Sequence, residues 1–256
     1  MSKVKVRYAP SPTGKLHIGN VHTFLFNYAF ARSQGGEVML RIEDTDEARN
    51  RTEFVQDIKD ALTWLGLSWD GEPEFQSKRQ SNYLGYAEKL LASGDAYYCY
   101  HTPEELESER SAQETKGQAP RYSGACRTLT EDQTEKYISE GRKPAIRFRM
   151  TGTNRPDEIK YNDLVYGEIK YDPRDIGDFV IVRSDRSILY NFANVIDDNL
   201  DEITHVIRGQ SHLTNTPRQI LIYQSLGFQV PRFGHLPEIL NPDRVGKLSK
   251  RYGAVA

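Results

Sequence analysis

Two short segments near opposite ends of this 256-residue chain carry residue types that commonly handle phosphate groups. In the first, residues 11–20, a glycine-bearing turn places His17 at the start of an apolar, helix-like segment. The backbone N–H groups at a helix start attract anions, and an imidazole there can donate a hydrogen bond as charge builds up in a transition state. In the second, residues 247–251 (Lys-Leu-Ser-Lys-Arg), two ammonium groups follow a flexible Arg-Val-Gly sequence. We expect these segments to close on a nucleoside triphosphate from two sides.

Each segment also has an ordinary structural explanation. His17 could cap a helix or pack against it, and a run of basic residues is usually a solvated surface. The first segment is neither a P-loop nor a Gly-x-Gly-x-x-Gly fingerprint, so it is not one of the common nucleotide-binding motifs. The nucleotide interpretation is favoured by the presence of both segments, in this order, around an alternating strand and helix pattern.

Composition and charge predict a folded, soluble protein. Hydrophobic residues make up 38% and charged residues 27% of the chain. No run approaches the ~20 apolar residues that a membrane-spanning helix needs, and the start has no apolar signal core. We expect a cytoplasmic, monomeric protein without a membrane span. The two cysteines do not form a disulfide framework.

The net charge of −2 argues against a general polyanion binder but allows a local basic patch. Such a patch is predicted between residues 141 and 160, where six bases face two acids. It is either a solvated surface or a contact for a nucleic-acid backbone. Its basic residues are Arg142, Lys143, Arg147, Arg149, Arg155 and Lys160.

The first 96 residues alternate between strand-like and helix-like patterns. Strands are predicted at residues 4–8 and 38–43. Helices are predicted at residues 17–33, with Ile18 and Leu25 on the apolar face, at 52–65, capped by Thr52, and at 81–92. Strand, helix, strand, helix is typical of a parallel sheet with right-handed crossovers, so we predict an α/β fold.

The pattern changes after residue 96 to an α+β region. A strand is predicted at 97–100, helices follow capping boxes at Thr102 and Thr130, strands follow at 145–150 and 165–171, and a hairpin pairs 178–183 with 187–192. A buried parallel strand at 203–208 and a helix at 216–227 then resume the first pattern. We predict a catalytic domain in two halves, 1–96 and 189–240, an inserted domain at 97–188, and a final segment at 241–256.

Several motifs together resemble one enzyme family. Residues 11–19 (Ser-Pro-Thr-Gly-x-x-His-Ile-Gly) and 247–250 (Lys-Leu-Ser-Lys) resemble the two signature motifs of class I aminoacyl-tRNA synthetases. The whole chain is similar to the bacterial glutamyl-tRNA synthetases. The segments that carry this narrower resemblance are Arg7-Tyr-Ala-Pro-Ser-Pro-Thr-Gly14, Arg41-Ile-Glu-Asp-Thr-Asp46, Tyr190-Asn-Phe-Ala-Asn194, Thr204-His-Val-Ile-Arg208-Gly and Asn215-Thr-Pro-Arg-Gln219.

The resemblance implies a Rossmann-like catalytic domain interrupted by a domain that binds the tRNA acceptor stem. It also implies a reaction in which ATP activates L-glutamate to glutamyl-adenylate, and the glutamyl group then passes to the 3′ end of tRNA(Glu). Positioning and charge stabilisation would do most of the work, because this chemistry needs no covalent enzyme intermediate. Mg²⁺ should accompany ATP, held largely by phosphates and water.

The same resemblance assigns the site residues. It places Arg7 at the side-chain carboxylate of glutamate, which an arginine can hold with a bidentate fork, and Glu43 at the α-ammonium group, which an anion suits. Asp44 is expected to be a turn residue rather than a ligand. The glutamate-binding residues implied are Arg7, Ser11, Glu43, Tyr190, Asn194 and Arg208. The ATP-binding residues implied are Pro10, His17, Gly19, Asn20, His212, Lys247, Leu248, Ser249 and Lys250, among which His17, Lys247 and Lys250 are the catalytic candidates. Asn20 stands where the family usually has a second histidine, and it cannot be cationic.

A third group, Cys99-x-His101 with Tyr122-x₃-Cys126, lies in the predicted insertion. Bacterial relatives often use a Cys-x-Cys…Cys-x-His zinc knuckle there, and a related tRNA-modifying enzyme uses Tyr-x₃-Cys. Cys, His, Tyr and Cys could complete a zinc tetrahedron, and a metal-free remnant is an equally good interpretation.

Three alternatives to glutamate–tRNA ligation stay open. A glutamyl-queuosine tRNA(Asp) synthetase lacks anticodon domains, but the charged segment 104–117 and the intact 247–251 segment argue against it. Specificity for glutamine is the second, because Arg7 is shared. An idle module that binds the tRNA acceptor end is the third, although His17, Lys250 and Arg7 are all present. The chain ends five residues after Arg251, so we expect a catalytic region without an anticodon-binding domain.

Overall fold

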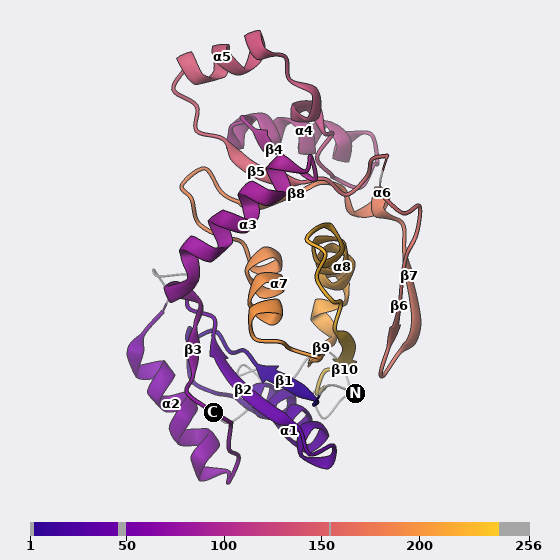
Figure 1. The fold of residues 1–256 in the computed structure, drawn as a ribbon. Coiled ribbons are helices and arrows are strands. Elements are labelled where there is room, and N and C mark those ends of the chain that lie inside the picture. The colour runs from indigo at the N-terminus through magenta and orange to yellow at the C-terminus, as the bar shows by residue number, and fades with distance from the viewer. Residues whose placement is uncertain (1–2, 46–49, 154, 241–256) are drawn as a thin grey trace.

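A parallel β-sheet forms the base of the molecule in the computed structural model, which describes residues 3–45, 50–153 and 155–240 (Figure 1). The strand order is β10-β9-β1-β2-β3, and every neighbouring pair is parallel. The predicted α/β class is therefore confirmed. Two strands of this sheet were not predicted, namely β3, which has only two residues, and β10. The bounds are β1 Lys5–Tyr8, β2 Glu37–Ile42, β3 Glu74–Phe75, β9 His205–Gly209 and β10 Arg232–Leu236.

Helices cover both faces of this sheet, as the buried strands of a parallel sheet require. Figure 1 shows α1 and α2 on one side and α7 and α8 on the other. Each side has its own apolar core, built around Phe24, Leu40 and Ile58 on the first and around Phe192 and Val206 on the second. The bounds are α1 Ile18–Ser33, α2 Thr52–Trp64, α3 Gln80–Ala92, α7 Tyr190–Leu200 and α8 Thr216–Ser225.

The inward face of α1 differs from the predicted one. Ile18 and Leu25 are half exposed, whereas Asn27 is fully buried. The Asn27 side chain donates to the Ile207 carbonyl at 2.9 Å and so ties α1 to β9. The amide nitrogen of Asn27 can point inward here because it donates to the carbonyls of Thr23 and Ile207. The predicted cap at Thr52 was also wrong, since the N-cap of α2 is Arg51, without a side-chain bond.

A second region, above the parallel sheet in Figure 1, contains a three-stranded antiparallel sheet in the order β4-β5-β8. The capping boxes predicted at Thr102 and Thr130 are both present. The domain boundaries stay a prediction. Between β4 and β8 the bounds are β4 Ala96–Cys99, α4 Pro103–Thr115, α5 Glu131–Ser139, β5 Ala145–Phe148, β6 Ile159–Asp163, β7 Gly167–Tyr171, α6 Pro173–Ile176 and β8 Phe179–Val182, with the short 3₁₀ helix η2 Ala125–Thr128. Two further 3₁₀ helices, η1 Gln76–Arg79 and η3 Gln210–Asn215, lie before and after this segment.

The predicted hairpin of 178–183 with 187–192 forms only next to its turn, where the Arg183 N–H donates to the Ser187 carbonyl at 2.9 Å and the Leu189 N–H donates to the Ile181 carbonyl at 3.0 Å. One bridge joins Val182 to Ile188, and α7 begins two residues later at Tyr190. The buried side chains Phe192, Val195 and Ile196 follow helical spacing, and their packing overrides a short strand-like alternation. A longer hairpin, which was not predicted, pairs β6 with β7.

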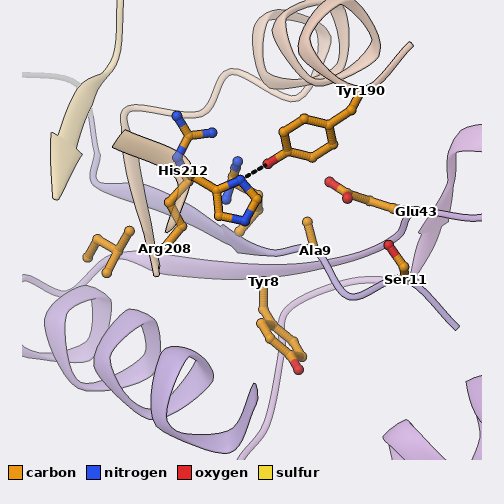
Figure 2. A pocket seen from close by; sticks show the side chains of 9 residues that line it. Tyr8, Ala9, Ser11, Glu43, Tyr190, Arg208 and His212 are labelled. Carbon is orange, nitrogen blue, oxygen red and sulfur yellow. Dashed lines mark hydrogen bonds between the residues drawn. The ribbon is translucent and has the colours of Figure 1, made fainter. Parts of the chain in front are cut away.

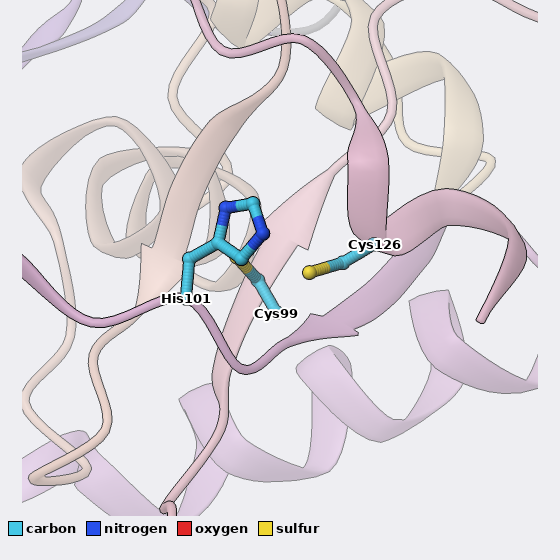
Figure 3. A group of neighbouring side chains, drawn as sticks. All are labelled: Cys99, His101 and Cys126. Carbon is cyan, nitrogen blue, oxygen red and sulfur yellow. The ribbon is translucent and has the colours of Figure 1, made fainter. Parts of the chain in front are cut away.

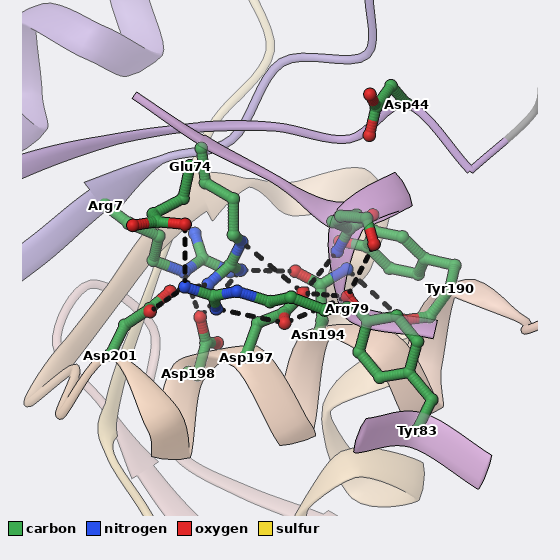
Figure 4. A network of polar contacts seen from close by, with 12 residues as sticks. Arg7, Asp44, Glu74, Arg79, Tyr83, Tyr190, Asn194, Asp197, Asp198 and Asp201 are labelled. Carbon is green, nitrogen blue, oxygen red and sulfur yellow. Dashed lines mark hydrogen bonds and ion pairs between the residues drawn. The ribbon is translucent and has the colours of Figure 1, made fainter. Parts of the chain in front are cut away.

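A buried ion cluster connects the parallel sheet to α7 (Figure 4). The fully buried Arg41 guanidinium of β2 lies 2.7 Å from Asp198 and 3.1 Å from Asp201. Arg79 of η1 approaches Asp201 at 2.7 Å and Asp197 at 3.2 Å. Because these carboxylates and guanidiniums lie within hydrogen-bonding distance of each other, their mutual attraction offsets the cost of burying their charges.

Among the described residues, none of the helices has the length and apolar character that a membrane span requires.

Removing Arg41 should leave buried carboxylates without their partner. We expect Arg41→Met to lower the free energy of unfolding by about 3–5 kcal/mol. The control Lys3→Met breaks the exposed Lys3–Glu37 pair and should cost about 1 kcal/mol or less. Urea denaturation of both variants measures this difference, and equal small losses would show that the cluster does not support the fold.

Candidate amino-acid and nucleotide site

A cavity of about 270 Å³ lies where β1, β2 and β9 end (Figure 2). Parallel strands place their carboxyl ends at one edge of the sheet, where open α/β folds usually bind ligands. The residues that line the cavity are Arg7, Tyr8, Ala9, Ser11, Glu43, Tyr190, Ile207, Arg208 and His212. The structure therefore brings together five of the six residues predicted to bind glutamate, from segments that are up to 201 positions apart.

The sixth, Asn194, lies one helical turn after Tyr190 on α7. Its amide donates to the Tyr190 carbonyl at 3.2 Å, and its Oδ1 accepts from Arg41 at 2.8 Å. Asn194 therefore does not line the cavity. It lies behind Tyr190, which does, and contacts Tyr190 and Arg41. His212, predicted for ATP, lies in the same cavity, with Nδ1 3.1 Å from the Tyr190 hydroxyl.

The cavity combines two buried guanidiniums with one carboxylate. Arg7 and Arg208 are 3% and 4% exposed, so both positive charges are largely shielded from solvent. Arg7 is held through its Nε, which donates to Asp198 at 2.9 Å. Burial raises the pKa of Glu43 to about 6, although Arg41 and Arg7 oppose this shift. Glu43 is therefore mostly ionised at neutral pH and can face a cation.

The predicted phosphate turn is next to this cavity along the chain. His17 is the N-cap of α1, and its Nδ1 accepts the Gly19 N–H at 3.2 Å. The capping explanation is thus realised. Because Nδ1 is an acceptor, the proton of the neutral ring is on Nε2, so a contact with phosphate would come from that nitrogen. A Cβ at Gly19 would lie 3.1 Å from the His17 ring, so glycine gives the ring its room.

Of the other residues predicted for ATP, Pro10 is buried and Asn20 is half-buried beside His17. The segment with Lys247, Leu248, Ser249 and Lys250 lies outside the described residues. The two-sided grip on a triphosphate therefore stays a prediction, as do the roles of the individual residues.

A larger cavity of about 710 Å³ adjoins the first, and both are lined by Ser11, Glu43 and Tyr190. Asp44, predicted to be a turn residue, lines it and accepts the Ser77 N–H and hydroxyl at 2.8 and 2.7 Å. Sequence reasoning missed Ser77 and its neighbours on η1 and α3 in this wall. They follow β3 at the same edge of the sheet, and no signal in the sequence pointed to them because this two-residue strand was not predicted.

Cys99, His101 and Cys126 lie together in the upper region (Figure 3). Their ligand atoms are within 4.8 Å of one another, and the buried Nδ1 of His101 has no hydrogen-bond partner in the described part of the chain. The Tyr122 hydroxyl is 3.5 Å from Cys99 Sγ and accepts the Cys126 N–H at 2.9 Å. The contact with Cys126 lowers the pKa of Cys99, which favours a thiolate at this position. These donors suit zinc, with Tyr122 beside them as the predicted fourth.

The upper bound on the spacing of these ligand atoms is close to the spacing in a zinc site. In a tetrahedral site with Zn–S distances of about 2.3 Å, two sulfurs lie about 3.8 Å apart. An inward movement of about an ångström at most separates the observed group from that geometry.

Residues 3–256 match the family model described as "tRNA synthetases class I (E and Q), catalytic domain". The chain is 50% identical to glutamate–tRNA ligase of Natranaerobius thermophilus, covering 98% of this chain and 52% of that protein. It is 52% identical to glutamate–tRNA ligase of Bacillus subtilis, covering 98% and 53%. The chain thus spans about half the length of the curated relatives it matches.

Solved structures agree. A glutamate tRNA ligase from Elizabethkingia meningosepticum, in complex with its amino acid, superposes with a TM-score of 0.89 at 39% identity, covering 98% of this chain and 53% of that one. A tyrosyl-tRNA synthetase from Archaeoglobus fulgidus, at 13% identity and a TM-score of 0.51, shares the fold alone. The parallel sheet and the cavity at its strand ends agree with the family match, which spans nearly every residue. The chain therefore belongs to the family of class I tRNA synthetase catalytic domains for glutamate and glutamine.

Proposed function

We propose that this chain activates L-glutamate with ATP and transfers it to the 3′ end of tRNA(Glu). The observation that carries the proposal is the match between the charges of the cavity and those of the substrate. Glutamate has two carboxylates and one ammonium group, and the cavity has Arg7 and Arg208 with Glu43. Glutamine has one carboxylate fewer, so it would leave one buried guanidinium without a charged partner.

The size of the cavity also favours an amino acid. About 270 Å³ lies at the small end of ligand pockets, so ATP must lie mostly outside it. We assign the phosphates to the start of α1 and the larger adjoining cavity to the terminal nucleotide of the tRNA. Ser11, Glu43 and Tyr190 line both cavities, which would bring the reacting groups together at that wall.

The residues would act by binding and orientation. Arg7 and Arg208 hold the carboxylates and Glu43 holds the ammonium group, so that one α-carboxylate oxygen can attack the α-phosphorus of ATP and displace pyrophosphate. The His17 Nε2–H and the N-terminus of α1 stabilise the phosphate charge, and Lys247 and Lys250 neutralise the leaving pyrophosphate. Mg²⁺ enters with ATP, held by phosphate oxygens and water. A ribose hydroxyl of the tRNA then attacks the glutamyl carbonyl and AMP leaves.

Glutamate-dependent exchange of pyrophosphate into ATP, with and without tRNA(Glu), tests this function. Exchange that requires glutamate supports it, and exchange with glutamine instead would reassign the specificity. Glutamate transfer only to tRNA(Asp) would indicate the queuosine-modifying activity. No exchange under any of these conditions would contradict the proposal and favour an idle module that binds the acceptor end.

Lys250→Ala should lower the rate constant of exchange at least about tenfold, which corresponds to about 1.4 kcal/mol of barrier, because one charge that stabilises pyrophosphate is lost. The KM for glutamate should stay the same, since the amino-acid cavity is formed by other residues. Lys15→Ala, at an exposed lysine near the phosphate turn, is the control. An equal loss in both variants would point to general charge attraction instead.

The pKa of Glu43 near 6 predicts how glutamate binding depends on pH. As the pH falls through about 6, the carboxylate gains a proton and loses its attraction for the ammonium group. The KM for glutamate should therefore rise by about tenfold per pH unit below that value. The neighbouring Arg7 and Arg41 keep their charge throughout this range. Glu43→Gln should give a high KM for glutamate that does not change with pH in this range. If the variant keeps the pH dependence of the wild type, Glu43 does not bind the ammonium group.

We also propose that Cys99, His101 and Cys126 hold a structural zinc ion, with Tyr122 as the fourth ligand. The unpartnered His101 Nδ1 beside two thiols supports this. Elemental analysis should find about one zinc per chain, and Cys126→Ser should lose the zinc and lower the melting temperature. Tyr122→Phe should weaken zinc binding if the phenol is a ligand. Zinc-free wild-type protein, purified from zinc-supplemented cells, would leave the group as a metal-free remnant.

A further inference from the structure

Arg208 is held in the cavity wall by neutral groups. Its Nε donates to His235 Nε2 at 3.2 Å and its Nη2 donates to the Thr216 hydroxyl at 2.8 Å. Its Nη1 is buried and has no partner in the described part of the chain. Since Arg208 lines the amino-acid cavity, Nη1 is the nitrogen left for a ligand.

The contacts of His235 determine its tautomer. An arginine can only donate, so Nε2 of His235 must be unprotonated to accept from Arg208, and the Thr216 hydroxyl, 3.0 Å away, can donate to the same nitrogen. The ring proton is therefore on Nδ1, which lies 2.6 Å from Asp163 Oδ2. Burial, together with the positive charge of Arg208, lowers the pKa of His235 to about 4, consistent with a neutral ring.

Asp163 reaches His235 from a different part of the chain. It ends β6, 72 residues before His235, and its Oδ1 accepts the N–H groups of Val165, Tyr166 and His235 at 3.0, 3.1 and 3.2 Å. The Leu164 N–H donates to the Phe233 carbonyl at 2.8 Å. The turn between β6 and β7 is thus docked against β10, with Asp163 fully buried in the contact.

We propose that Asp163 and His235 are positioning residues for substrate recognition. Asp163 keeps the proton of His235 on Nδ1, and Nε2 then orients the Arg208 guanidinium so that Nη1 meets a carboxylate of the amino-acid substrate. The inference rests on the proposed binding of glutamate. It assigns to the β6–β7 hairpin, within the segment predicted to contact the tRNA acceptor stem, a share in forming the amino-acid pocket.

Asp163→Asn tests the tautomer directly. Three backbone N–H groups would keep the amide oxygen at the Oδ1 position, so the NH₂ group would face His235 Nδ1. That arrangement moves the ring proton to Nε2, which then opposes the Arg208 N–H. We expect the KM for glutamate to rise about tenfold or more, with the KM for ATP within about twofold of wild type. Glu168→Gln, an exposed carboxylate-to-amide change on β7 of the same hairpin, should change neither value.

A double-mutant cycle separates positioning from a merely structural role. The amide oxygen of His235→Gln can accept from Arg208 whatever residue 163 is. Asp163→Asn should therefore cost much less in the glutamine background than in the histidine background. The same cost in both backgrounds would overturn the proposal, as would an Asp163→Asn variant with wild-type KM for glutamate.

Nitrogen-15 NMR of the wild-type histidine rings supplies a readout apart from activity. His235 should give the Nδ1–H tautomer, and an Nε2–H tautomer or a charged ring would contradict the inference even if the variants do not fold. If the wild-type protein shows no glutamate-dependent exchange and no glutamate binding, the proposed function fails first and takes this inference with it. If it binds glutamate and the variants behave as wild type, only the inference fails.

Discussion

The contact between the α7 carboxylates and the arginines of β1, β2 and η1 is the interaction on which the site most depends. A buried ion cluster is seldom a better source of stability than apolar packing of the same volume. Here the cluster also positions a side chain of the cavity, because the Asp198 carboxylate pairs with both Arg41 and Arg7. The same carboxylate that neutralises the core therefore sets the direction of a guanidinium in the amino-acid cavity, and the register of α7 against the sheet becomes a property of the site.

The two arginines of the cavity are held in different ways, and the difference matters for charge. Arg7 is paired with a carboxylate, whereas Arg208 is held by an imidazole and a hydroxyl that carry no charge. The positive charge of Arg208 is thus available to a ligand, apart from the influence of Glu43 across the cavity. An anionic side chain would complete this balance, while a neutral one of similar shape would leave a buried charge unmatched. The preference for glutamate over glutamine would then follow from how Arg208 is held as much as from its presence.

Local sequence patterns predicted much of the fold, whereas the resemblance to a known family supplied the predicted residues of the amino-acid site. The strand before the phosphate turn, the capping boxes at Thr102 and Thr130 and the alternation of parallel strands with helices all depend on neighbours within a few residues. Five of six predicted glutamate-binding residues do line one cavity, although their roles stay predictions. Residues 187–192 were predicted to be the second strand of a hairpin, and only the tertiary fold shows that α7 begins at Tyr190.

Other features could not be predicted because their physical cause lies far away along the chain. The residues around His235 do not predict that it is buried or that a carboxylate 72 residues earlier sets its tautomer. The residues around Asn27 do not predict its hydrogen bond to β9. A buried polar residue becomes intelligible only once its partner is known.

The supports of the amino-acid cavity also bear on how the chain divides into domains. Asp163 lies within the segment predicted to be an insertion, yet its hydrogen bonds are made to β10 of the parallel sheet and to its own turn. Were that segment an independent unit, a carboxylate buried at its boundary would have to lose and regain its partners whenever the two parts moved, at the high cost of exposing or isolating a charge. The hairpin is therefore better regarded as part of the catalytic core.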